Sequence, residues 1–295
     1  MKIKEVKAKS LLIKVGSPEN WFGNVYNMNI YRGCQHGCIY CDSRSQCYHV
    51  ENFDDEVIIK SNVLELLKKE LSSKKLVGTI GTGAMSDPYI PLEKKYNLTG
   101  EALKIIEYYK FPVTVITKSS LILKDIDALK GINKNTQATV GITITTVNEK
   151  LARIIEPKAP SPLERLEALK KLSMEGIYAG VLMMPILPYI NDSEDNVREI
   201  IEASNRAGAK FIIPMFGVTL RDAQRVYFYN KLDSNFKDLK QRYIKAYGEN
   251  YVCMSKSTKE LWNLTKRLCG EYDIVSNMRD LKVYKPDEYV QTSLF

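Results

Sequence analysis

The sequence lacks the long apolar runs that mark membrane and secreted proteins. No run approaches the ~20 residues needed to cross a membrane. The basic N-terminal stretch is followed only by Leu11-Leu12-Ile13, which is far too short for the core of a signal peptide. No internal repeat appears beyond an alternation of strands and helices, and no low-complexity tract interrupts the chain. We therefore expect a globular cytoplasmic protein without a membrane partner.

Cysteine and histidine are also scarce, with six and two residues in a chain of 295. Six cysteines in so long a chain do not indicate a disulfide framework, and a reducing compartment fits free thiols. His36 is expected to be part of a loop structure, and His49 has no evident partner. The histidines therefore predict no metal site of their own.

Acidic residues are fewer than basic ones. The chain has 35 Asp and Glu and 43 Lys and Arg, which gives a net charge of +8. Such an excess is compatible with a polyanionic partner such as nucleic acid. The cations are spread along the chain, however, and composition alone favours a solvated lysine-rich surface.

Three of the cysteines, Cys34, Cys38 and Cys41, are concentrated in one stretch with C-x3-C-x2-C spacing. Gly33 and Gly37 let the backbone fold tightly enough for the thiolates to converge on one metal centre. Three thiolates leave one coordination position open, which indicates chemistry more than scaffolding. A zinc site with a distant fourth ligand such as Cys47 remains an alternative.

The pattern along the chain predicts about six strand–helix alternations, which are typical of parallel strands with crossover helices. The predicted strands are 25–30, 76–80, 113–117, 139–145, 178–184 and 211–213. The predicted helices between them are 61–71, 100–109, 121–129, 161–176 and 193–206. Ser161 to Glu164 has the form of a capping box with proline at the first helical position. The pattern alone does not distinguish a barrel from an open sheet.

Four segments are expected. Residues 1–24 form an irregular N-terminal segment, 25–218 the core, 219–284 a helical extension with helices at 221–247 and 257–269, and 285–295 a mobile tail.

The cysteine spacing, with the aromatic Tyr40 directly before the last cysteine, closely resembles that of the radical S-adenosylmethionine (radical SAM) enzymes. The resemblance implies that the three cysteines bind a 4Fe–4S cluster, whose open iron takes the amino and carboxylate groups of SAM. One electron from an external donor would then cleave SAM to methionine and a 5′-deoxyadenosyl radical. It also implies an α/β fold, a partial (β/α)6 TIM-like barrel with a C-terminal helical extension.

Further segments resemble the spore photoproduct lyase-like proteins, a branch often labelled DNA repair photolyases. They are Tyr31 to Cys41, Ser86-Asp87-Pro88-Tyr89 with Glu93, Thr117-Lys118-Ser119, Glu156-Pro157, Ala159-Pro160, Arg165-Leu166, and Pro185 to Asp192. By this resemblance Tyr40 touches the adenosyl group, Ser86 and Asp87 contact SAM, Lys118 binds its carboxylate, and Thr143 lies near the ribose.

The chain departs from that family at one place. Spore photoproduct lyase carries a hydrogen-donor cysteine shortly before the Ser-Asp pair, where this chain has Gly83-Ala84-Met85. The reversal of a thymine lesion is therefore in doubt, and no catalytic residue can be named. One of the eighteen tyrosines could replace the donor.

The last five residues, Gln291 to Phe295, resemble the motif that binds the bacterial sliding clamp. Gln291, Ser293, Leu294 and Phe295 fit its pattern, and a Leu-Phe anchor on a mobile end can fill an apolar pocket. The alternative is a tail that tucks these side chains into its own core.

Three functions remain open. The first is a radical SAM enzyme acting on nucleic acid, as in DNA repair by a lyase. The second is a radical SAM enzyme acting on a peptide or small molecule. The third is a clamp-tethered binding module whose metal site is structural.

Overall fold

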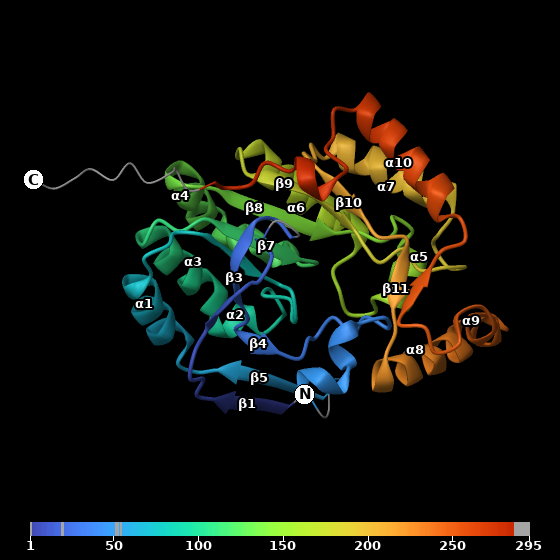
Figure 1. Cartoon of the computed structure of the whole chain (residues 1–295), viewed down its shortest axis with the longest axis horizontal. Coiled ribbons are helices and arrows are strands. Elements are labelled where there is room, and N and C mark those ends of the chain that lie inside the picture. Colours follow the sequence, from blue (N-terminus) through green and yellow to red (C-terminus); the bar gives the residue numbers. More distant parts are fainter. Residues whose placement is uncertain (1, 19–20, 51–52, 54, 286–295) are drawn as a thin grey trace, which may run out of the picture.

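A seven-stranded sheet lies at the centre of the computed structural model, which describes residues 2–18, 21–50, 53 and 55–285 (Figure 1). Its strand order is β10-β9-β8-β7-β6-β3-β2, and every pair is parallel except β2 with β3. The strands are β2 (Leu12–Lys14), β3 (Asn24–Met28), β6 (Thr79–Thr82), β7 (Val113–Thr117), β8 (Ala138–Thr143), β9 (Tyr178–Met183) and β10 (Ile212–Pro214).

All six predicted strands are present, each within a few residues of the expected position, and the α/β fold is confirmed. The order of the strands is linear, and β10 and β2 lie at its two ends. The described sheet is therefore open, as a partial barrel requires.

Helices connect the parallel strands and cover the sheet (Figure 1). They are α1 (Val63–Ser73), α2 (Glu93–Tyr96), α3 (Leu98–Tyr108), α4 (Ile126–Asn135), α5 (Glu149–Ile155), α6 (Pro162–Met174) and α7 (Glu194–Arg206). The capping box at the start of α6 is confirmed, because Ser161 N donates to Glu164 Oε2 at 2.7 Å and Glu164 N donates to Ser161 Oγ at 3.2 Å.

The core lies between the sheet and these helices. Strands β7 and β8 are buried almost throughout, and they present β-branched side chains to the apolar faces of α3 and α4. Burial on both faces explains why these two strands appear in the sequence as continuous apolar runs without alternation.

The expectation of an irregular N-terminal segment was wrong. β1 (Lys2–Val6) pairs with β5 (Glu56–Lys60), and β5 pairs with β4 (Tyr31–Arg32), so that a second, three-stranded sheet forms. β1 is an exposed edge strand with three charged residues among its five, so it has no apolar face that would reveal it.

The C-terminal extension is largely helical, as expected, but its first helix is two helices. α8 (Asp222–Asn235) and α9 (Leu239–Tyr247) are separated at Asp238, which adopts a positive φ of 59°. Between α9 and α10 (Thr258–Glu271), the short strand β12 (Val252–Met254) pairs with β11 (Gly217–Thr219). α10 packs against α7 of the core.

The division of the chain at residues 24, 218 and 284 stays a prediction. The clamp-like sequence Gln291 to Phe295 lies outside the described residues. A search of the described helices finds none with the length and apolar character needed to span a membrane.

Candidate functional site

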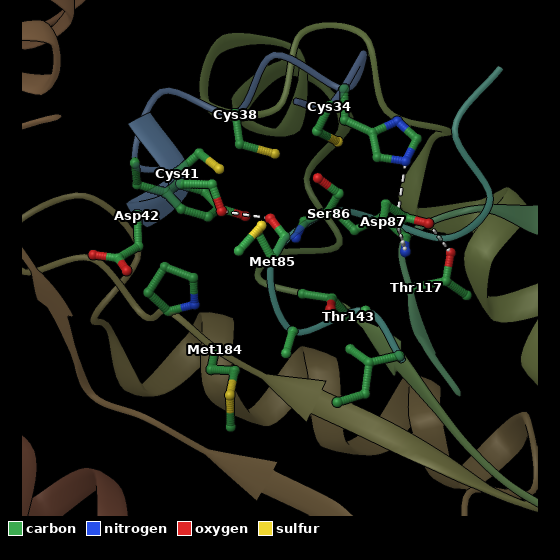
Figure 2. A pocket seen from close by; sticks show the side chains of 18 of the residues that line it. Cys34, Cys38, Cys41, Asp42, Met85, Ser86, Asp87, Thr117, Thr143 and Met184 are labelled. Carbon is green, nitrogen blue, oxygen red and sulfur yellow. Dashed lines mark hydrogen bonds and ion pairs between the residues drawn. The ribbon is translucent and has the colours of Figure 1, made fainter. Parts of the chain in front are cut away.

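A cavity of about 300 Å³ opens at the carboxyl ends of the parallel strands, where ligands bind in open α/β sheets. Cys34, Cys38 and Cys41 all line it, and Figure 2 shows their sulfur atoms along one wall. Across from them lie residues at the carboxyl ends of β6, β7, β8 and β9 (Figure 2). The structure therefore brings the three cysteines together with the strand ends, as the sequence predicted.

The loop that carries the cysteines is held by backbone contacts. Gly33 has a φ of +84°, and a Cβ there would lie 2.6 Å from the carbonyl oxygen of Glu56. Ile39 N donates to Ile155 O, and Lys158 N donates to His36 O, both at 3.0 Å. The loop is thus fixed on one side by β5 and on the other by the segment after α5.

The three thiols share a cavity without gathering around one point. Among the described residues, no group of three His, Cys, Asp or Glu side chains is close enough to hold a single metal ion. Burial raises the pKa of each thiol, that of Cys38 to about 12, although Lys118 and Arg165 oppose the shift at Cys38. These thiols would therefore ionise only when a metal replaces the proton.

Asp87 joins the cysteine loop to the sheet. Its carboxylate pairs with His36 Nε2 at 3.1 Å and accepts hydrogen bonds from Thr117 Oγ1, Lys118 N and Tyr89 N at 2.6–2.8 Å. Three hydrogen bonds and one close contact with an imidazole nitrogen thus surround the carboxylate. These contacts fix His36 and the end of β7, and Asp87 also lines the cavity, so its contact with SAM stays a prediction.

The side-chain hydroxyl of Ser86, unlike the carboxylate of its neighbour Asp87, is unpaired within the described residues. Its side chain lines the cavity, and its Oγ is buried without a hydrogen-bond partner among the described residues. A buried hydroxyl left unpaired costs free energy unless a ligand or water binds it. Gly83 allows this geometry, because its φ is +96° and a Cβ would lie 2.1 Å from the carbonyl oxygen of Ile116.

Lys118 and Tyr40 meet at the floor of the cavity. The ammonium of Lys118 lies 5.7 Å from the centre of the Tyr40 ring and, within the described chain, forms no ion pair or side-chain hydrogen bond. Burial alone would lower the pKa of Lys118, but negative charge at Cys38 and Glu156 raises it. The lysine therefore stays protonated and can bind an anion.

A buried network beneath the loop orients Tyr40. The Tyr40 hydroxyl donates a hydrogen bond to Glu156, whose other oxygen pairs with Arg165 Nη2 at 2.6 Å. Arg165 also donates to the carbonyl oxygens of Pro160 and Thr143, at 2.9 and 3.1 Å. Burial and the negative charge of Glu156 raise the pKa of Tyr40 well above its usual value, so the phenol keeps its proton.

The remaining wall is mostly apolar. Met85, Met184, Pro185 and Met215 line it, and Thr143 contributes a polar side chain at the end of β8 (Figure 2). Of the adjacent methionines in the sequence, only Met184 faces the cavity, because Met183 is packed in the core.

The C-terminal extension closes the cavity on one side, which the sequence did not suggest. Val218 and Thr219 of β11 line the cavity, and so does Asp42. Arg221 pairs with Asp42 at 2.5 Å, while Gln224 Nε2 donates to the carbonyl oxygens of Tyr40 and Thr219. The extension is therefore part of the site.

Sequence reasoning assigned no role to the residues that organise the site. They are His36, Asp42, Glu156, Arg165, Thr219 and Arg221. His36, Glu156 and Arg165 did stand in segments that carried the family resemblance, and His36 was expected to belong to the loop structure.

Replacing Asp87 with asparagine is expected to lower the stability of the metal-free protein by about 2 kcal/mol at neutral pH. Burial opposes the shift, but His36 and the hydrogen-bond donors lower the pKa of Asp87 to about 2. A folded-state pKa below the unfolded value contributes stability above about pH 4, which is lost as the pH falls towards 2.

Urea unfolding from neutral to acidic pH would measure the effect. The difference between wild type and Asp87→Asn should shrink as the pH falls, whereas Asp127→Asn, on the exposed side of α4, should change little. An Asp87 variant as stable as wild type at neutral pH would contradict this account.

The amino-acid sequence is similar to those of known proteins. A model of the radical SAM superfamily matches residues 28–202. An uncharacterized protein of Methanocaldococcus jannaschii is 35% identical over 196 residues, which cover 66% of this chain and 71% of that protein.

Two solved structures of spore photoproduct lyase share the fold. One, complexed with dinucleoside spore photoproduct, gives a TM-score of 0.68 at 16% identity and covers 93% of this chain and 81% of that one. The other, a mutant with bound AdoMet and the same dinucleoside, gives 0.67 at 16% identity, with 93% and 80% covered. At this identity the likeness establishes the fold alone.

Proposed function

The chain belongs to the radical SAM superfamily, and we propose that it cleaves SAM reductively at a 4Fe–4S cluster held by Cys34, Cys38 and Cys41 and acts on nucleic acid. When bound, the cluster supplies the electron that breaks SAM into methionine and a 5′-deoxyadenosyl radical, which takes a hydrogen atom from the substrate. We also propose a cytoplasmic location, because such a cluster needs reducing surroundings.

The lining of the cavity is the main support for this function. Three thiols line one wall of a cavity, and its other walls present two groups without a side-chain partner among the described residues, the ammonium of Lys118 and the buried hydroxyl of Ser86. In a cubane cluster each thiolate binds a different iron, so thiols spread over one wall fit a cluster better than a single zinc ion.

The residues around the cavity suit SAM. Lys118 would bind the carboxylate, Ser86 would donate a hydrogen bond, and Thr143 would lie near the ribose. Tyr40, fixed by Glu156, would support the adenosyl group. Asp87 would contact SAM and, in addition, hold His36 and Lys118 N in place. The methionines of the apolar wall would exclude water from a reactive radical.

Two observations support a nucleic-acid substrate. The chain carries a net charge of +8, and a protein with the same fold has been solved in complex with a dinucleoside lesion. The second candidate is a radical reaction on a peptide or small molecule. It is favoured by the absence of a thiol in Gly83-Ala84-Met85, where the lesion-repairing family keeps its hydrogen donor.

An anaerobic assay would test the proposal. The reconstituted protein is incubated with SAM and dithionite, with and without ultraviolet-damaged DNA, and 5′-deoxyadenosine is measured by chromatography. Formation of the nucleoside supports the cleavage, and a change in the DNA supports the substrate. A fully loaded protein that gives no 5′-deoxyadenosine under either condition would contradict the proposal.

The partner at the C-terminal tail also stays a proposal. A bacterial sliding clamp should bind a peptide that ends in Gln291 to Phe295, and replacing Leu294 and Phe295 with alanine should abolish that binding.

Replacing Lys118 with methionine is expected to weaken SAM binding about 10- to 100-fold, because a charged hydrogen bond contributes about 1.5–3 kcal/mol. Ser86→Ala should have a smaller effect of only a few fold, since a neutral hydrogen bond contributes about 1 kcal/mol. Equilibrium dialysis with labelled SAM on the reconstituted proteins would measure both. Lys104→Met, on the exposed face of α3, is the control. Unchanged affinity in Lys118→Met would remove this lysine from the SAM site.

A further inference from the structure

The end of the cavity nearest the C-terminal extension has no role in the proposed binding of SAM. The SAM contacts proposed above come from Tyr40 and from residues at the ends of β6, β7 and β8. Four further residues line the cavity at the extension: Asp42 from the cysteine loop, and Met215, Val218 and Thr219 before and within β11. This end is therefore available to a second ligand.

Asp42 presents an unused hydrogen-bond acceptor at this end. It directly follows Cys41, and its side chain lines the cavity (Figure 2). One carboxylate oxygen, Oδ2, accepts hydrogen bonds from Arg221 Nη2 at 2.5 Å and from Tyr48 Oη at 2.8 Å. The other oxygen, Oδ1, is buried and has no partner within the described chain. A buried carboxylate oxygen without a donor costs free energy, so a ligand that supplies the donor is favoured.

The ion pair between Asp42 and Arg221 determines which kind of donor fits Oδ1. A carboxylate only accepts hydrogen bonds, so the ligand must carry an N–H or O–H group. Because Arg221 already balances the charge of Asp42, an ammonium group at Oδ1 would place a second cation beside the guanidinium. An uncharged N–H or O–H group avoids that repulsion. The pair therefore favours a neutral donor.

Aromatic and apolar side chains continue from this end of the cavity to the surface. Thr219, which lines the cavity, is paired in the sheet with Val252 of β12. Val252 and its neighbour Tyr251 are each 47% exposed. The guanidinium of Arg221 lies 5.3 Å from the centre of the Tyr251 ring and 5.5 Å from that of the Tyr48 ring. Exposed aromatic rings beside a cation are typical of surfaces that bind unstacked nucleobases.

We propose that Asp42 Oδ1 accepts a hydrogen bond from the edge of a nucleobase of the substrate, which is held between the cysteine loop and β11. This role rests on the proposed function and names the residue that recognises the substrate. The edge of each DNA base carries an N–H group that is uncharged, and a splayed-out base exposes that edge. Arg221 and Tyr48 hold the carboxylate in place. A peptide amide also carries a neutral N–H group, but the exposed rings of Tyr48 and Tyr251 beside a cation favour a base.

The affinities for two probes test this role. Two fluorescein-labelled single-stranded pentanucleotides, one of mixed sequence and one abasic throughout, are titrated by anisotropy into the cluster-loaded protein with SAM present. Wild type should bind the probe with bases more than tenfold more tightly than the abasic one. In Asp42→Asn that ratio should fall about tenfold, because the amide oxygen would take the bonds from Arg221 and Tyr48 and leave an N–H donor in the place of Oδ1.

The ratio of the two affinities cancels a partial loss of folding or of the cluster, which would weaken both probes alike. Asp42→Glu provides a second variant, because it keeps a charge for Arg221 but moves both oxygens, and it should lower the ratio in the same way. Asp127→Asn, on the exposed side of α4, is the matched control and should keep the wild-type ratio.

The failures are distinguishable. If wild type binds neither probe, the proposed nucleic-acid substrate is contradicted. If wild type binds both probes equally, or if both Asp42 variants keep the wild-type ratio, the role of Asp42 alone is overturned. A loss of affinity for N-acetyl-tetraalanine amide in Asp42→Asn, with an unchanged probe ratio, would also overturn it and would mark this end of the cavity as a peptide subsite.

Discussion

Cys38→Ala is expected to abolish formation of 5′-deoxyadenosine and to remove most of the bound iron and sulfide. Cys38 is one of three thiols in the cavity, and each is expected to bind a different iron. No other cysteine among the described residues lines the cavity. Cys253 and Cys269 are buried in apolar clusters, so neither could replace the lost thiol. Anaerobic iron and sulfide analysis, the visible absorption of the cluster, and chromatography of the SAM products would check this.

Cys47→Ala provides the matched control. Cys47 is exposed, and its thiol lies 3.2 Å from Ser45 Oγ, outside the cavity. Its removal should leave both the cluster and SAM cleavage intact. If Cys47→Ala also lost the metal, or if wild type held only zinc and ignored SAM, the three-thiol cluster would be contradicted and a structural zinc site would replace it.

The parallel core could be predicted because its strands are buried on both faces. Val113 to Thr117 and Ala138 to Thr143 are continuous β-branched or apolar runs, and such runs indicate a strand without knowledge of its neighbours. β1 could not be found in this way, because three of the five residues from Lys2 to Val6 are charged and the strand lies at an exposed edge. The break between α8 and α9 was missed because it depends on one left-handed residue, Asp238, in a sequence of ordinary helical composition.

The candidate site could also be predicted only in part. The cysteines could be identified because their spacing is local, and a loop of eight residues determines which thiols can share a cavity. The residues that hold the loop come from far along the chain: Glu156 lies 116 residues from Tyr40, and Arg221 lies 179 residues from Asp42. Contacts over such distances leave no periodic pattern in the sequence. The contacts of Asp87 could not be predicted for the same reason, because its partners His36 and Thr117 belong to two other segments.

Arg165→Met is expected to lower the free energy of unfolding by about 3–5 kcal/mol, which is typical when one partner of a buried ion pair is removed. Arg165 is 1% exposed and contacts a carboxylate that is equally buried. Methionine fills a similar space, but within the described part of the chain it leaves Glu156 with only the hydroxyls of Tyr40 and Thr145 as donors. It also removes the hydrogen bonds that Arg165 donates to the carbonyl oxygens of Pro160 and Thr143. Urea unfolding of the metal-free protein at neutral pH would measure the loss.

A double-mutant cycle separates the ion pair from simple packing. Glu156→Gln keeps an acceptor for Tyr40 and removes the charge, so Arg165→Met/Glu156→Gln should be less destabilised than the sum of the two single variants. Strictly additive losses would show that Arg165 acts through packing and backbone contacts alone. Because Glu156 also holds Tyr40, Arg165→Met should slow SAM cleavage even under conditions where the protein is fully folded and carries its cluster. A folded, loaded variant that cleaves SAM at the wild-type rate would show that the network supports the fold without positioning the site.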